Sequence, residues 1–134
     1  RRRLMPRAPA LRNDEQLSRI AEMRACELAH SGKPISHLDG NRHFESADII
    51  YSVLGPYGAV AENRMQMDTS ASGGAFDAAT FANAAADAWL NSPEHRPQIL
   101  DPRYNLSGIG VARIGGQAVA TQVFHGPPRR RASR

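Results

Sequence analysis

The order of apolar and polar positions along the chain predicts three helices of ordinary length. Apolar residues recur at helical spacing from residue 13 or 14 to about 29, from 45 to 54, and from about 77 to 91. The asparagine and aspartate that open the first of these stretches are both good helix caps. Arg24 lies on the apolar stripe of this helix, so it must either extend its charged end to solvent or pair with a carboxylate.

The last third of the chain has the pattern of strands. Residues 107–114 and 117–124 flank Gly115-Gly116, and two glycines between apolar runs are a strong signal for a two-residue hairpin. Residues 59–67 read as an earlier strand. Helices followed by strands in the last third indicate an α+β domain.

The stretch from Trp89 to Leu100 joins the third predicted helix to the strands. Ser92 is a good cap for a new turn, and Pro93 suits its first position because its missing N–H would have no partner there. Pro97 should end this turn and push Arg96 out of the helical region. The turn holds Glu94 and His95 on a fixed backbone. Neighbours on a helix point about 100° apart, so the two side chains need not serve one site.

Length and cysteine content limit the classes of protein to which the chain can belong. A chain of 134 residues is one domain that can bury a core of its own. Its single cysteine, Cys26, allows no internal disulfide, so the fold does not depend on an oxidising compartment. No apolar run approaches the roughly 20 residues that a membrane span needs. No signal peptide is visible, although a trimmed chain would have lost one.

The charge is unevenly distributed. Nine of the 17 Lys and Arg residues lie in residues 1–12 and 129–134, and the stretch between has 8 basic residues against 13 acidic ones. A nucleic-acid-binding domain usually carries its basic patch on the fold, interleaved with aromatic residues, so we expect no specific nucleic-acid partner. Solvated ends are the plainest expectation, and salt-sensitive contact of these arms with a polyanion is the alternative. The domain boundaries predicted are a basic arm at 1–12, a folded domain at 13–126 and a basic tail at 127–134.

The residues alone leave the chemistry open. Gly108-Ile109-Gly110 precedes a strand and not a helix, so it is no phosphate-binding loop. The chain has neither a paired-histidine zinc helix nor a Cys-x-x-Cys motif, and no serine has nucleophile-elbow glycines around it. What remains is a scattered set next to turns or strand ends: His37, Glu62, Glu94 and His95. Two imidazoles and a carboxylate can ligate zinc or form a proton-transfer pair, whereas a lone loop histidine more often only hydrogen-bonds.

Five motifs in order carry a resemblance to a known family. They are Ser36-His37-x-Asp39-Gly40, Ala61-Glu62-Asn63, Trp89-x-x-Ser92-Pro93-x-His95-Arg96-x-x-Ile99-Leu100, Gly108-Ile109-Gly110-Val111-Ala112 and Thr121-Gln122-Val123-Phe124. In order and spacing the chain resembles the bacterial branch of the CAP superfamily, the cysteine-rich secretory, antigen 5 and pathogenesis-related proteins, also called SCP-like domains. The resemblance covers about residues 11–126.

The resemblance implies a three-layer α-β-α sandwich with a small, mainly antiparallel sheet and a cleft lined by histidines and acidic residues. His37 would be the first cleft histidine, Glu62 the glutamate of the family's Gly-Glu-Asn motif, and His95 the histidine of its Ser-Pro-x-His-Arg motif. Asn63 and Gln122 would be supporting polar groups. Glu94 is a fourth acidic candidate for the same cleft.

The chain departs from the family pattern in several places. Ala61 stands where glycine is usual, Gln98 stands where asparagine is usual, and residues 117–120 lack the histidine that many eukaryotic members carry. At most three of the cleft positions, His37, Glu62 and His95, are then expected to converge. The family's opening helix is missing or trimmed, which would leave an apolar face for a partner or a second copy to cover.

Two functions from different classes remain, the first supported by the resemblance and the second by the ligand chemistry of the candidate residues alone. The first is a secreted or cell-envelope binding module for a lipid-like or envelope ligand, without turnover. The second is a metal-dependent hydrolase in which His37, Glu62 and His95 hold zinc or another divalent cation. These three residues are therefore the catalytic and metal candidates, and no other cofactor and no membrane span is expected.

Overall fold

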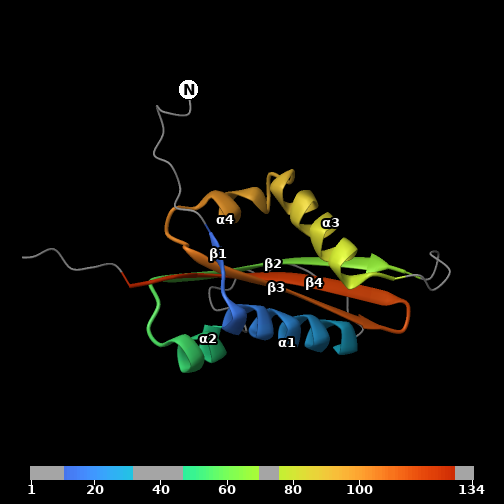
Figure 1. The fold of residues 1–134 in the computed structure, drawn as a ribbon, viewed down its shortest axis with the longest axis horizontal. Helices are drawn as coiled ribbons and strands as arrows, with labels where there is room; N and C mark the ends of the chain where they lie inside the picture. The colour runs from blue at the N-terminus through green and yellow to red at the C-terminus, as the bar shows by residue number, and fades with distance from the viewer. Residues whose placement is uncertain (1–10, 32–46, 70–75, 129–134) are drawn as a thin grey trace, which may run out of the picture.

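The computed structural model describes residues 11–31, 47–69 and 76–128, and these form four strands and four helices (Figure 1). In chain order they are β1 (Arg12–Asn13), α1 (Glu15–Ser31), α2 (Ala47–Leu54), β2 (Ala59–Asp68), α3 (Ala78–Leu90), α4 (Arg96–Leu100), β3 (Leu106–Ile114) and β4 (Gln117–Gly126). None of these helices has both the length and the apolar character needed to cross a membrane.

The four strands form one sheet in the order β1-β3-β4-β2. The three long strands are antiparallel, and β1 adds two residues in parallel to the outer edge of β3. The β3–β4 turn is made by Gly115-Gly116, as predicted, with Gly115 at a φ of 61° that favours glycine. The sheet is therefore small and mainly antiparallel.

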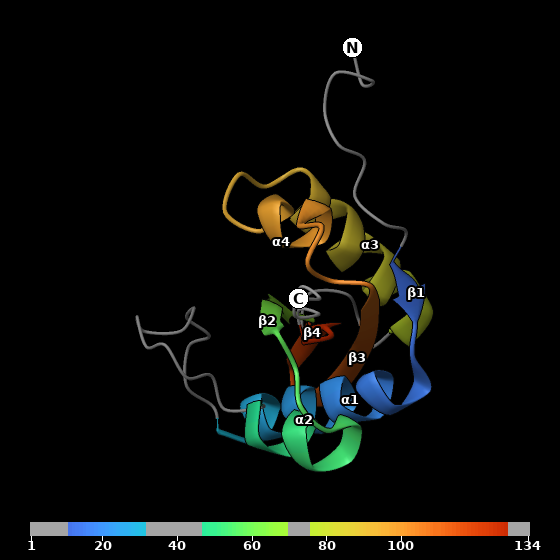
Figure 2. The same cartoon turned by 90° about the vertical axis from the view of Figure 1, so that its left-hand side faces the viewer.

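Helices cover both faces of this sheet. α1 and α2 lie on one face, and α3 and α4 lie on the other, so the molecule has three layers (Figures 1 and 2). This confirms the α-β-α sandwich within an α+β class. Each face has its own apolar core. The core under α1 contains Leu17, Ile20, Ala21, Ile50 and Val123, and the core under α3 contains Phe81, Ala85, Trp89, Ala118 and Ala120.

α1 lies directly against the backbone of β3. A β-carbon at Gly108 or Gly110 would collide with the backbone of α1 at Ser18 or Glu22. These two glycines of the Gly-x-Gly motif therefore allow close helix–sheet packing and bind no phosphate. The buried hydroxyl of Thr121 donates to the carbonyl of Ala21 at 2.8 Å, which ties the same helix to β4.

Most of the predicted element boundaries are confirmed, and one local prediction is wrong. Asp14 caps α1 by accepting from the N–H of Leu17 at 3.0 Å, and Asp77 caps α3 in the same way. The turn at Ser92 was expected to stop before Pro97 with Arg96 outside the helix. α4 instead begins at Arg96 and includes Pro97, because a proline in the first helical turn has no intrahelical bond to lose.

His125 on β4 is a buried titratable group between the sheet and α1. It pairs in register with Val60 and Leu106, and its side chain is 7% exposed. Its ring lies edge-on to Tyr57, and neither ring nitrogen has a hydrogen-bond partner among the described residues. Burial lowers the pKa of His125 below its ordinary value of 6.5, and the charge of nearby Asp14 only partly opposes this.

We expect acid to destabilise the fold through His125. The unfolded chain takes up a proton near pH 6.5 while the folded ring stays neutral, so stability is complete above this pH and falls as the pH drops towards the folded pKa. Between these two pKa values, the free energy of unfolding falls by up to about 1.4 kcal/mol per pH unit. Urea unfolding of the wild type and of His125→Phe between pH 7.5 and 5 should show a weaker pH dependence in the variant. Equal slopes would contradict this.

Candidate functional site

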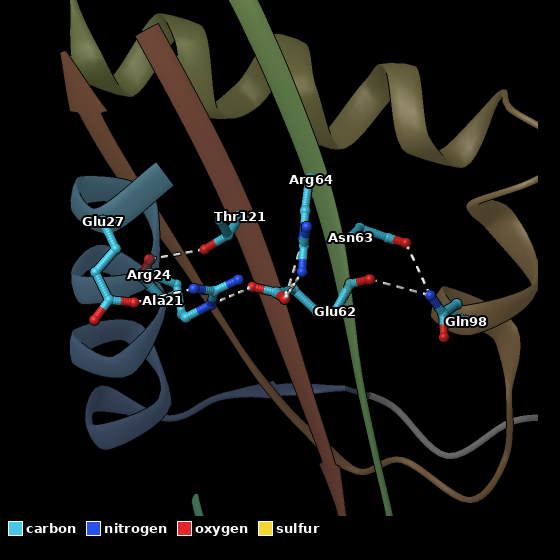
Figure 3. A network of polar contacts seen from close by, with 8 residues as sticks. All are labelled: Ala21, Arg24, Glu27, Glu62, Asn63, Arg64, Gln98 and Thr121. Carbon is cyan, nitrogen blue, oxygen red and sulfur yellow. Dashed lines mark hydrogen bonds and ion pairs between the residues drawn. The ribbon is translucent and has the colours of Figure 1, made fainter. Parts of the chain in front are cut away.

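The carboxylate of Glu62 lies at the centre of a buried polar network under α1 (Figure 3). Its side chain is 1% exposed, and both oxygens accept hydrogen bonds from guanidinium groups. Arg24 Nε donates to Oε2 at 3.2 Å, while Arg64 Nε and Nη2 donate to Oε1 at 3.3 and 3.2 Å. Glu62 is thus held between a residue of α1 and a residue of its own strand.

The two arginines are themselves buried, with side chains 6% and 10% exposed for Arg24 and Arg64. Arg24 also donates to Glu27 Oε1 at 3.0 Å, and Glu27 reaches solvent. Of the two possibilities for Arg24, extension to solvent or pairing with a carboxylate, the structure therefore shows the second. Among the described residues, the network holds two buried guanidinium groups and one buried carboxylate, with Glu27 adding a negative charge at its solvent side.

Asn63 points to the opposite face of the sheet, as alternation along a strand requires. Its side chain is fully buried, its Nδ2 donates to the carbonyl of His95 at 3.4 Å, and its Oδ1 accepts from Gln98 Nε2 at 3.1 Å. Gln98 Nε2 also lies 3.3 Å from the carbonyl of Glu62, which β2 can offer because it is an edge strand (Figure 3). The Ala-Glu-Asn motif therefore joins α1 on one side and α4 on the other.

The imidazole of His95 is half-buried, and its Nδ1 lies 2.9 Å from Ser92 Oγ. The same hydroxyl accepts from the backbone N–H of Glu94, whose side chain is exposed. Ser92 thus fixes the turn and the ring together. His95 belongs to the α3–α4 side of the sheet, whereas the carboxylate of Glu62 faces α1.

The remaining predicted positions are placed as follows. Gln122 lies opposite Asn63 in the strand register and is buried, and its Oε1 has no hydrogen-bond partner in the described part of the chain. His37 lies outside the described residues. Within residues 11–31, 47–69 and 76–128, no three His, Cys, Asp or Glu side chains form a group suited to a metal ion. The set of His37, Glu62 and His95 therefore stays a prediction.

The geometry of Glu62 does not fit a metal ligand as it stands. A carboxylate that binds zinc uses an oxygen lone pair at about 2.0–2.2 Å from the ion. Both Glu62 oxygens instead face guanidinium groups, which would have to move away from an incoming cation. Arg64 was not predicted as a partner of Glu62. The sequence pattern that could have predicted this contact is the Glu-x-Arg spacing, because residues two apart in a strand lie on the same face.

Comparison with known proteins follows from this geometry. A three-layer domain with this Glu–Asn strand and Ser-Pro-x-His-Arg turn matches a family model described as "Cysteine-rich secretory protein family", CAP, over residues 1–124. The chain belongs to the CAP family, because the match covers most of its 134 residues. The resemblance drawn from the five motifs is confirmed. No curated protein sequence matches the chain.

Several solved structures share the fold. An outer surface protein of Borrelia burgdorferi is 17% identical with a TM-score of 0.63, over 90% of this chain and 80% of that one. An extracellular protein containing an SCP domain from Bacillus anthracis is 19% identical with a TM-score of 0.58, over 89% and 34%. NaASP2, solved with Zn²⁺, is 13% identical with a TM-score of 0.59, over 88% and 60%. The chain spans about a third of the length of the Bacillus protein.

Replacing Glu62 by glutamine should destabilise the domain strongly. The change removes the buried carboxylate that the two guanidinium groups share, and breaking a buried pair by removing one partner costs about 3–5 kcal/mol. Urea denaturation measures this loss as a fall in the free energy of unfolding.

The matched control is Glu15→Gln. Glu15 pairs with Arg19 on the surface of α1, with side chains 79% and 74% exposed, and solvent screens such a pair. The control should therefore change the free energy of unfolding far less. Equal, small losses in the two variants would show that the Glu62 network is not a buried ion cluster.

Proposed function

We propose that this CAP-family chain acts outside the cytoplasm as a binding or interaction module, and that its ligand is lipid-like or a component of the cell envelope. Family membership supports this, and two structural relatives are an outer surface protein and an extracellular protein. The binding cleft in this proposal lies on the α3–α4 side of the sheet, where Asn63, Glu94, His95 and Gln122 are placed, and Glu62 supports it from the α1 side. His37, the sixth predicted position, lies outside the described residues.

One observation carries the choice of binding over turnover. Both oxygens of Glu62 accept from buried guanidinium groups, so a metal ion or a substrate proton would have to compete with two cations for this carboxylate. An acidic residue engaged in this way orders the wall of a cleft. Asn63 does the same on the other face through Gln98 and the backbone of His95.

The alternative is a metal-dependent hydrolase in which His37, Glu62 and His95 hold zinc or another divalent cation. Its support is the donor chemistry of these residues, together with a relative, NaASP2, whose structure was solved with Zn²⁺. This function would require Glu62 to exchange Arg24 and Arg64 for the ion.

A binding panel separates the two functions. Calorimetry with a sterol, a long-chain fatty acid, an envelope glycan and Zn²⁺ should show saturable binding of at least one organic probe and no stoichiometric binding of Zn²⁺. We expect His95→Ala to weaken the organic interaction at least tenfold. His30→Ala, at an exposed histidine of α1, should leave it unchanged.

Two results would contradict the proposal. One is the absence of saturable binding for all three organic probes. The other is one-to-one binding of Zn²⁺ that is lost in both His37→Ala and His95→Ala, because this would show that the two imidazoles share a metal site and would favour the hydrolase.

We also propose self-association across the open edge of the sheet. Beyond Ser107 the outer edge of β3 pairs with no strand in the described part of the chain. A groove of about 360 Å³ runs there between α1 and α3. Its lining combines the apolar residues Ala78, Ala82, Ile109 and Val111 with the charged residues Glu15, Arg19 and Glu22 of α1. This edge is a surface that a second copy can cover.

Light scattering over a range of concentrations tests self-association. The mean mass should rise with protein concentration, and Ala82→Glu should suppress the rise by placing a charge in the groove. Ala84→Glu, at an exposed position of the same helix outside the groove, is the control. A chain that stays monomeric at every concentration would contradict the proposal.

A further inference from the structure

Nine arginines and no lysine supply the positive charge of the two ends of the chain, residues 1–12 and 129–134. A guanidinium presents a planar fork of N–H donors that matches two oxygens of one phosphate, whereas an ammonium is a point charge. Neither end contains an aromatic side chain, and proteins that bind single-stranded nucleic acid use aromatic rings to stack on bases. Leu4 and Met5 lie instead among the arginines of the first end. Arginines next to aliphatic side chains suit an anionic lipid surface better than a nucleic acid.

Both arginine-rich ends are attached to the folded domain at the same end of the sheet. Arg12 in β1 pairs with Leu106 in β3, and Leu106 pairs with His125 in β4. Adjacent strands are about 4.8 Å apart, so the two points of attachment are separated by about 10 Å. Asn105 links them, because its carbonyl accepts from the N–H of Arg12 at 3.0 Å and its N–H donates to the carbonyl of His125 at 3.1 Å. The nine arginines are therefore tethered at one place, so that binding through one end favours binding through the other.

Exposed apolar side chains lie at this end of the domain as well. Leu100, the last residue of α4, is 51% exposed and precedes the loop to β3. Tyr51 of α2 is 57% exposed, and its ring lies edge-on to Tyr57, which in turn lies edge-on to His125 at the end of β4. A surface that combines cations with exposed apolar groups can contact both the phosphates and the apolar layer of a membrane.

The rest of the domain carries the opposite charge. The stretch between the two ends has 8 basic residues against 13 acidic ones. Asp68 closes β2 beside the β3–β4 turn, and Asp77 begins α3 near Arg113 at that same far end of the sheet; both aspartates are exposed. At the arginine-rich end, Asp101 is already paired with Arg103 at 2.8 Å. An anionic surface therefore attracts one end of the molecule and repels the other, which fixes the orientation of approach.

We propose that the chain docks through this end on the surface of a membrane that contains anionic phospholipids. The guanidinium groups of residues 1–12 and 129–134 bind lipid phosphates, and the exposed Leu100 and Tyr51 face the apolar layer. The contact is made with a surface and not with a molecule held in the cleft, so it does not rest on the function proposed above. Salt screens the attraction of exposed arginines to phosphate, so docking should weaken steeply as salt rises.

Co-sedimentation of the full chain with lipid vesicles tests this docking. The chain should bind vesicles that contain equal amounts of phosphatidylcholine and phosphatidylglycerol, at least tenfold more weakly at high salt, and should not bind phosphatidylcholine alone. Two matched variants each remove four charges. One replaces Arg1, Arg2, Arg3 and Arg7 by glutamine, and the other replaces Arg129, Arg130, Arg131 and Arg134. Each should weaken binding at least tenfold, and combining them should abolish it.

A matched pair of single substitutions separates the arginine-rich ends from charge in general. Arg130→Gln should weaken vesicle binding about fivefold, the effect of one arginine at an anionic membrane surface. Arg113→Gln removes the same charge at the far end of the sheet, where the side chain is exposed, and should change binding less than twofold.

Three outcomes would overturn the proposal. The first is equal binding to the two kinds of vesicle. The second is unchanged binding in either fourfold variant, because this would show that the two ends do not act on one surface together. The third is tighter binding to a DNA duplex than to the anionic vesicles at the same phosphate concentration, which would assign the arginine-rich ends to nucleic acid.

Discussion

The structure depends on the buried carboxylate of Glu62 and the two guanidinium groups that hold it. Burying charges is costly, and the cost is offset only where the partners meet with good geometry. Here Arg24 comes from α1 and Arg64 from β2, so the three groups fasten the helix to the edge strand. The close approach at Gly108 and Gly110 and the bond from Thr121 to Ala21 fasten the same helix to β3 and β4. α1 is thus fixed to each of the three long strands by a different interaction.

In this arrangement the two motif residues Glu62 and Asn63 make contacts in different layers of the domain. Glu62 and Asn63 are neighbours in sequence, but they face different layers, and only Asn63 reaches the turn that carries His95. The polar groups therefore link the three layers at one region of β2, and both oxygens of Glu62 are engaged by guanidinium groups.

The elements that could be predicted from the sequence are those set by local chemistry. Helical spacing located α1 and α3, good capping residues marked the start of α1, and the paired glycines located the β3–β4 turn. β1 has two residues and no pattern to detect, and the start of α4 was missed because Pro97 was expected to end a helix and instead lies in its first turn. For the site, Glu62 and Asn63 were found by their motif. The Arg24–Glu62 pair joins residues 38 positions apart, and only tertiary packing brings them together. The alternation of a strand was the available signal that Glu62 and Asn63 face opposite ways.

The most direct test is to observe the side-chain Nε–H groups of Arg24 and Arg64 by ¹⁵N NMR, with and without Zn²⁺. The account predicts two resonances protected from exchange with solvent, lost together in Glu62→Gln and unchanged when Zn²⁺ is added. Loss of both resonances on adding Zn²⁺, with simultaneous shifts of the imidazole signals of His37 and His95, would contradict it. That result would show that Glu62 leaves its arginines to join the two histidines at a metal ion.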